Sequence, residues 1–158
     1  MIGTPTDPAV VVTFELKDGE AWMEKRVAGD TDVRRHPADD EDRTKYRAEW
    51  EAFRAGHRGP LGTPIEAWPE MTKELAAELR YRGIPTVESL AATSDGCAQG
   101  LPNGYTLRKN AAAWLKQKVE DATARDLAAR DDEIDTLRRM VREQGEQIAQ
   151  LLAAGKAG

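Results

Sequence analysis

LAARDDEIDTLRRMVREQGEQIAQL, residues 127–151, decides the architecture of this chain. Six apolar side chains in it repeat with heptad spacing, at the a positions Leu127, Ile134, Val141 and Ile148 and at the d positions Leu137 and Leu151. A seven-residue apolar repeat keeps one side of a helix facing a partner helix, as a coiled coil requires. The stretch therefore predicts a long C-terminal coiled-coil helix through which the chain self-associates.

Two d positions of this repeat are polar, Arg130 and Gln144. β-Branched residues at a with leucine at d favour parallel dimers, and a buried polar layer fixes register or oligomer number at a cost in stability. Glu133 at g and Arg138 at the following e position would pair across a parallel interface, a contact worth about 0.2–1 kcal/mol when exposed. The heptad thus predicts a homo-oligomer formed through the C-terminal helix.

The same residues leave other arrangements open. Asp126 and Asp131 hold the equivalent g and e positions one heptad earlier and would repel each other. Four heptads with two polar layers make a weak coil, so we expect neighbouring subunits or a host surface to help hold it. A long helix folded back on the rest of the chain as an antiparallel hairpin, or a solvated lone helix, would also fit.

The composition suits one modest domain joined to an extended helix. Of the 158 residues, 40% are hydrophobic and 32% are charged, which leaves too few apolar side chains for a large core. The formal charge of -5 gives the whole chain no net attraction for nucleic acid or acidic lipid. A lone cysteine, Cys97, excludes an intrachain disulfide and fits a reducing compartment.

Membrane and secretion signals are missing from the sequence. No stretch approaches the ~20 consecutive apolar residues of a membrane span. The start, MIGTPTDPAVVV, lacks the basic region and the apolar run of a signal peptide. We therefore expect no membrane partner, and a protein that stays in a cytoplasm or in a particle assembled there.

Changes in composition divide the chain into three predicted parts. Residues 1–38 are an N-terminal arm and β-strand region, residues 39–118 are a helical body, and residues 119–158 are the coiled-coil helix. The predicted fold class is mainly α, with a small N-terminal β element, a helix-hairpin-helix-like body and the long C-terminal helix.

The β element centres on the β-branched stretch 9–16 (AVVVTFEL), which the turn signal Asp18-Gly19 follows. The residues around Ala21–Met23 fit either a returning strand or a short helix. Residues 28–42 are polar and contain a proline, so they predict a loop.

Aromatic spacing marks the first helix of the body. Tyr46, Trp50 and Phe53 are four and three residues apart and fall on one helix face. The acidic run 39–42 precedes them, as expected near the positive end of a helix dipole, and Gly56 is a natural stop.

Prolines and helix N-cap residues predict where helices are excluded and where they begin in the rest of the body. Residues 57–70 (HRGPLGTPIEAWPE) contain three prolines and exclude a helix, while Leu61, Ile65 and Trp68 predict that this linker is packed and not free. Thr72 and Thr86 are N-cap residues for two short helices. Residues 94–104 predict a turn region, and a single helix of about 50 residues should follow from 105 to 154.

Residues 70–118 have the pattern of helix-hairpin-helix domains, in which amides of a glycine hairpin at a helix N-terminus can hold a DNA phosphate. Here LPNG, residues 101–104, takes the place of the hairpin, and its proline removes an amide donor. Arg108 and Lys109 are the cations available for a nucleic-acid contact. On an acidic chain, this pattern favours a protein-packing module over a DNA-binding one.

Two flanking motifs carry a resemblance to a known family. GTPIEAWP, residues 62–69, precedes the helical repeat, and LRKNAAAWL, residues 107–115, follows it. This arrangement resembles a family of small tailed-bacteriophage proteins with a GTPxxxWP linker and a helix-hairpin-helix-like repeat. The resemblance covers roughly residues 9–118 and transfers no catalytic residue. The family usually has glycines in the hairpin, so residues 101–103 depart from its pattern.

The resemblance implies a non-enzymatic virion structural protein, assembled into particles in the host cytoplasm. We expect an oligomeric capsid-associated decoration or accessory protein. Its partners would be further copies of itself and the major capsid protein or another virion protein. A scaffolding or connector component fits the same features, as does a DNA-binding helix-hairpin-helix protein used in packaging or replication.

No motif points to catalysis, a cofactor or a metal ion. His36 and His57 are the only histidines and lie far apart, with Cys97 distant from both, so no spacing matches a zinc site. Both histidines are expected to be solvated. The acidic run 39–42 lacks the glycine and the alternating ligands of a calcium loop.

Overall fold

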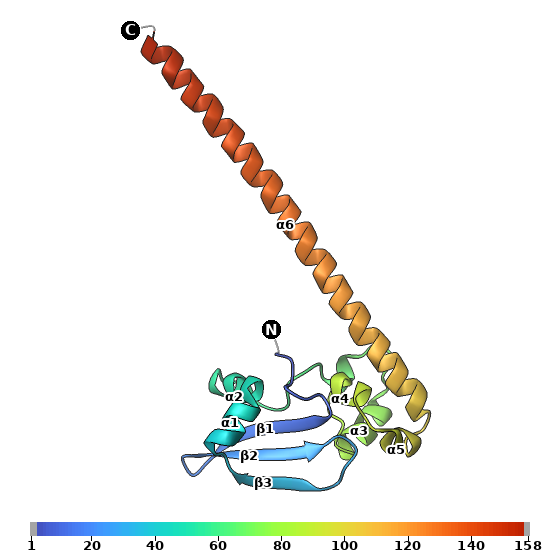
Figure 1. Cartoon of the computed structure of the whole chain (residues 1–158). Coiled ribbons are helices and arrows are strands. Elements are labelled where there is room, and N and C mark those ends of the chain that lie inside the picture. Colours follow the sequence, from blue (N-terminus) through green and yellow to red (C-terminus); the bar gives the residue numbers. More distant parts are fainter. Residues whose placement is uncertain (1–2, 157–158) are drawn as a thin grey trace. The chain divides into compact units, whose positions relative to one another are not determined.

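The computed structural model describes residues 3–156 and consists of two compact units, Met1–Leu115 and Lys116–Gly158. The first unit holds a β-sheet and a set of short helices (Figure 1). The second unit is the greater part of one long helix.

An antiparallel sheet with the strand order β1-β2-β3 opens the first unit (Figure 1). Its strands are β1 Val10–Lys17, β2 Glu20–Val27 and β3 Val33–Pro37. Asp18 and Gly19 have φ angles of 53° and 83°, as a two-residue turn needs in order to match the twist of the strands. The turn sets Phe14 opposite Met23, and Met23 lies opposite His36 on β3.

The prediction of a mainly α fold with one small β element was wrong, because a complete three-stranded sheet makes the chain α+β. Residues 20–27 are the returning strand, and residues 33–37, predicted as loop, form the edge strand β3 on the far side of β2 from β1. Strand β3 buries no side chain, and its sequence VRRHP therefore lacks the alternation of apolar and polar residues that marks a half-buried strand. Backbone pairing with β2 holds it in place, and such pairing leaves little trace in the sequence.

The first hydrophobic core lies on one face of this sheet. Its buried residues are Val12, Phe14, Met23, Ala38 and Tyr46. Two short helices follow the sheet, α1 Asp40–Lys45 and α2 Arg47–Arg54. Phe14 meets Trp50 edge to face with ring centroids 5.1 Å apart, and its ring lies 6.1 Å from that of Phe53. Such aromatic pairs add about 0.5–1.5 kcal/mol to the burial of their surface.

The acidic run is a helix start, as predicted. The Asp39 carboxylate accepts a hydrogen bond from the Asp42 amide, and the Asp42 carboxylate accepts one from the Asp39 amide. Burial opposes the charge on Asp42, yet hydrogen bonds from Asp39 and from His36, 2.8 Å away, keep its pKa below the ordinary value. His36 is therefore paired, not free in solvent as predicted.

Tyr46 separates helix α1 from helix α2, so two short helices replace the single helix that was predicted here.

Short helical segments fill the rest of the first unit. They are η1 Ile65–Ala67, α3 Lys73–Tyr81, α4 Val87–Ala91 and α5 Asp95–Gln99. Thr72 and Thr86 cap α3 and α4 with their side chains, as predicted. Helix α5 occupies a stretch that was predicted as a turn, and the Ser94 side chain caps it. The prediction missed this helix because it contains Gly96, and glycine has a low helix propensity.

These segments enclose a second hydrophobic core. Its buried residues are Ala28, Ile65, Trp68, Ala76, Leu79, Ile84, Val87, Leu90, Leu101 and Ala111. The proline-rich linker belongs to it, because Ile65 and Trp68 are 0% and 2% exposed. The predicted packing of this linker is thereby confirmed.

One continuous helix, α6 Gly104–Lys156, ends the described chain. Its 53 residues span about 80 Å at 1.5 Å per residue. The predicted long C-terminal helix is thereby confirmed. The helix starts against α5, and Gly104 makes this contact possible: a Cβ there would lie 1.8 Å from the Ala98 carbonyl oxygen.

Gly104→Ala should lower the free energy of unfolding of the first unit by about 1–3 kcal/mol, because α5 or α6 must shift to admit the methyl group. Chemical denaturation followed by tryptophan fluorescence reports on this unit, since all four tryptophans lie in it. Gly96→Ala is the matched control, with nothing within 4 Å of the added Cβ. Equal stability of the two variants would contradict the packing described for α5.

Candidate self-association surface

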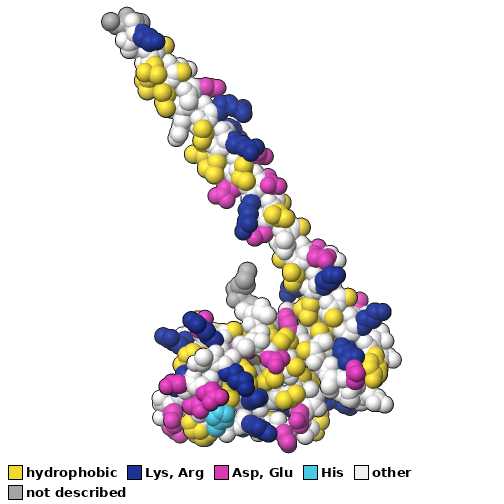
Figure 2. Space-filling model, in the orientation of Figure 1, with side chains coloured by type: hydrophobic (Ala, Val, Ile, Leu, Met, Phe, Trp, Pro, Cys, Tyr) yellow, Lys and Arg dark blue, Asp and Glu magenta, His cyan; other side chains and the backbone are white. Residues whose placement is uncertain are grey.

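The heptad residues form one line along the second unit, which we call the apolar seam. It consists of Leu127, Ile134, Leu137, Val141, Ile148 and Leu151, whose exposed fractions run from 45% to 73%. Seven residues fall about 20° short of two full helical turns, so residues with this spacing stay on one side of the helix. Figure 2 shows hydrophobic side chains recurring along the helix, with charged side chains between them.

None of the seam residues is buried in the described part of the chain. Gly104 and Ala111 are the only buried residues of α6 in its described range. Most helical stability in proteins comes from packing an apolar face, and an uncovered helix in water is marginal. Full burial is worth roughly 1.5–3 kcal/mol for each large aliphatic side chain. A partner helix on the seam would therefore stabilise α6 substantially.

Two further apolar residues flank the seam. Met140 at g and Leu152 at e are 48% and 63% exposed. They lie outside the a and d positions from which the seam was predicted, although each directly adjoins a seam residue, Val141 and Leu151 respectively. They widen the apolar stripe in the C-terminal half of the repeat, where a partner would bury the most surface.

Charged and amide side chains interrupt the seam. Arg130 lies 3.6 Å from Asp126 one turn earlier, and both side chains are more than two-thirds exposed. Exposed pairs of this kind contribute about 0–1 kcal/mol. Glu133 and Arg138 form no ion pair with any residue between 3 and 156. Both side chains are thus available to a second molecule.

Replacing Ile134, Val141 and Ile148 together by Glu should abolish self-association, because each glutamate would place a charge where a partner helix must pack. We expect light scattering to give the single-chain mass of 17.4 kDa. Circular dichroism at 222 nm should show reduced helicity that no longer rises with protein concentration.

The control adds three glutamates at outer positions of the same helix, Thr136→Glu, Ala149→Glu and Ala153→Glu. It changes the net charge by the same amount and leaves the seam intact. We expect this protein to keep the wild-type mass. Loss of mass in both variants would show that charge, and not the seam, governs association.

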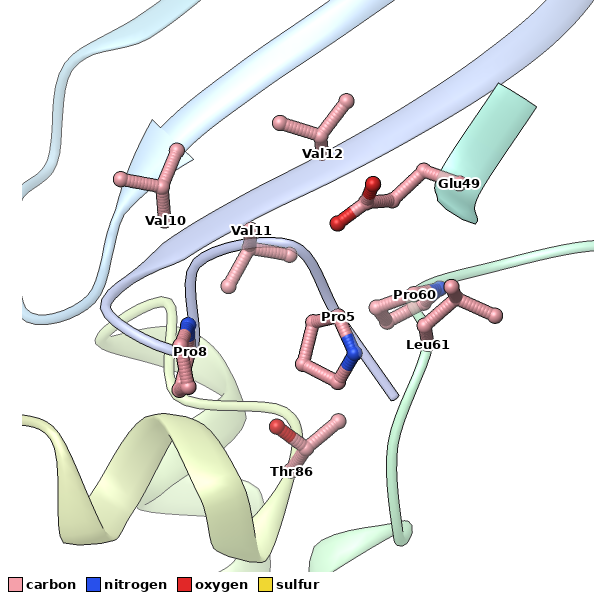
Figure 3. A pocket seen from close by; sticks show the side chains of 9 residues that line it. All are labelled: Pro5, Pro8, Val10, Val11, Val12, Glu49, Pro60, Leu61 and Thr86. Carbon is pink, nitrogen blue, oxygen red and sulfur yellow. The ribbon is translucent and has the colours of Figure 1, made fainter. Parts of the chain in front are cut away.

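Within the first unit, a polar contact that the sequence did not indicate holds the N-terminal arm on helix α2. The Thr6 amide and hydroxyl donate hydrogen bonds of 2.7 and 2.6 Å to the two carboxylate oxygens of Glu49, which is 5% exposed on α2. Pro5 and Pro8 line a hollow of about 10 Å³ beside strand β1, next to Val11 (Figure 3). Such a volume admits about one water molecule. The arm is therefore packed on the body and leaves no room there for a ligand.

Glu88 repeats this arrangement in the helical segments. Its carboxylate accepts hydrogen bonds of 2.7 and 2.9 Å from the Thr63 amide and hydroxyl. Gly62 has a φ of 113°, and a Cβ there would lie 2.7 Å from a Glu88 oxygen. The first two residues of the linker motif thus have a structural explanation. Gly62 allows the close approach of Glu88, and Thr63 donates two hydrogen bonds to the Glu88 carboxylate.

Glu49→Ala should lower the free energy of unfolding by about 1.5–3 kcal/mol, because it removes two hydrogen bonds to a charged group and leaves the Thr6 donors unpaired. Hydrogen exchange at the Thr6 amide should become fast. Glu51→Ala on the same helix removes only an exposed pair with Arg47 and should cost under about 0.5 kcal/mol. A Glu49 variant as stable as the Glu51 variant would refute this role of the contact.

The two candidate nucleic-acid contacts differ in their surroundings. Arg108 donates a 3.0 Å hydrogen bond to the Thr93 carbonyl oxygen, and it lies 2.8 Å from an Asp95 carboxylate oxygen. Its guanidinium also stacks 5.3 Å from the Tyr105 ring centroid. Lys109 is exposed. Arg108 therefore already joins α6 to the segment around α5, and DNA contact by these residues stays a prediction.

The groups considered for chemistry lie apart from one another. Between residues 3 and 156, no three His, Cys, Asp or Glu side chains are grouped so that they could hold a metal ion. His57 lies 3.4 Å from the Pro60 carbonyl oxygen. Cys97 is half-buried against the second core, and burial raises the pKa of its thiol although Arg82 acts in the opposite sense. A thiol in this environment is a poor nucleophile at neutral pH.

No helix in the described part of the chain is long and apolar enough to cross a membrane. Comparisons of the chain with protein-family models, with curated proteins and with solved structures gave no match. The resemblance to small tailed-bacteriophage proteins therefore stays a prediction from the motifs.

Proposed function

We propose that the protein is a non-enzymatic structural component of a tailed-bacteriophage particle, bound to the capsid shell as an oligomer. The observation that carries the oligomeric part is the uncovered apolar seam of α6. The phage part rests on the linker motif GTPIEAWP and the motif LRKNAAAWL.

The two units have different roles in this proposal. Residues 1–115, with their two cores, supply the contact with the major capsid protein or another virion protein. The seam joins copies, so that several bodies bind the shell together. Linking binding modules in this way raises overall affinity by about 10²–10⁴ without any new contact to the shell.

Quantitative mass spectrometry of purified particles tests this function. Copies per shell would be counted in mature and immature particles assembled with the wild-type protein, the three-glutamate seam variant or the outer-position control. We expect many copies in mature particles for the wild type and the control. For the seam variant we expect at least about a tenfold loss, since avidity is gone.

Other outcomes would overturn the proposal in defined ways. Presence in immature particles alone would indicate a scaffolding protein. Absence from both particle types would reject a virion role and favour the DNA-binding alternative. Full occupancy by the seam variant would show that each body binds the shell independently.

A further inference from the structure

We propose that two copies of α6 pair in parallel and in register from Leu127 to Leu151, and that the polar d residues enforce this alignment. The inference rests on the self-association in the proposed function and names its partner, a second copy of this chain in one orientation. The paired segment spans roughly 36 Å at 1.5 Å per residue. All of it lies inside the second unit.

The shapes of the seam residues favour two parallel strands. Ile134, Val141 and Ile148 are β-branched and occupy a positions, whereas Leu137 and Leu151 occupy d positions. In parallel coiled coils, β-branched residues at a with leucine at d select dimers over trimers and tetramers.

Alternation at the d positions specifies the register. Along the helix these positions read Arg130, Leu137, Gln144 and Leu151, so polar and apolar residues alternate. In register, each layer pairs identical residues. A slip of one heptad would set a polar residue against a leucine in each of the remaining d layers, and burying a polar group without a partner costs roughly 1–3 kcal/mol.

The same residues disfavour an antiparallel pair. Full antiparallel overlap places each a residue beside a d residue of the partner helix. Arg130 would then face Ile148, and Gln144 would face Ile134. Parallel pairing removes both contacts between a polar residue and isoleucine: Gln144 meets Gln144, whose amides can hydrogen-bond to each other, and Arg130 meets Arg130 next to the Asp126 and Asp131 carboxylates.

Charges flanking the seam agree with parallel pairing. Glu133 at g would reach Arg138 at the next e position of the partner helix, and neither has an ion-pair partner in the described part of its own chain. One heptad earlier, Asp126 and Asp131 would repel across the interface. The two Arg130 guanidiniums of that layer lie between these carboxylates and offset the repulsion.

Cysteine cross-linking tests orientation and register on the purified full chain. In a Cys97→Ser background, Leu151→Cys should form a disulfide-linked dimer in a glutathione redox buffer, since identical d residues face each other in a parallel pair. The matched control is Ala149→Cys at an outer b position, which should link at least tenfold less. Mixing Leu127→Cys with Leu151→Cys protein should give only linked pairs of identical chains.

Several results would overturn this inference. Linked products between Leu127→Cys and Leu151→Cys chains would mean antiparallel pairing, and a mass of three chains by light scattering would mean a trimer. Single-chain mass throughout would remove self-association and with it the oligomeric part of the proposed function. A linked parallel dimer that is absent from particles would uphold this inference and reject the virion role.

A double substitution tests the register role of Arg130 and Gln144. Arg130→Leu combined with Gln144→Leu should raise the melting temperature of the coil, because both polar layers become apolar. It should also allow slippage, so that Val141→Cys chains link to Ile148→Cys chains in a mixture. With the polar layers intact, we expect only 141–141 and 148–148 links. Equal 141–148 linking with and without the polar layers would refute the register role of Arg130 and Gln144.

Discussion

The exposure of the apolar seam to water dominates the energetics of the second unit. Six large aliphatic side chains repeat along a helix that buries no residue after Ala111 within its described range. Hydrophobic free energy then favours a second helix over solvent. The seam is also interrupted by polar layers, so its association free energy is limited. Such a surface suits a protein that adds modest contacts together in a larger assembly.

The first unit is built on a different principle. It has two small cores, one on a face of the sheet and one among short helices, and a buried or half-buried polar contact accompanies each of them. Glu49 and Glu88 each accept an amide and a hydroxyl hydrogen bond from one threonine. Charge-assisted bonds of this kind are about twice as strong as neutral ones. They help to hold the N-terminal arm on helix α2 and the proline-rich linker on helix α4.

Sequence periodicity predicted the parts of the structure where apolar residues recur at regular spacing. The long helix, the caps Thr72 and Thr86 and the packed linker are such features. The edge strand β3 and helix α5 were missed, because one buries no side chain and the other contains a glycine. The Glu49 contact joins residues 43 positions apart and has no local signature. The seam residues were predicted from the heptad, whereas Met140 and Leu152 fell outside its a and d positions.

Sedimentation equilibrium of the unmodified chain tests whether the seam pairs two copies. We expect a concentration-dependent mass that approaches twice the 17.4 kDa of one chain. The apparent affinity should change little with salt, since apolar burial and not charge drives the association. A mass that stays at one chain up to millimolar concentration would contradict it, because the seam would then be stable in water without a partner.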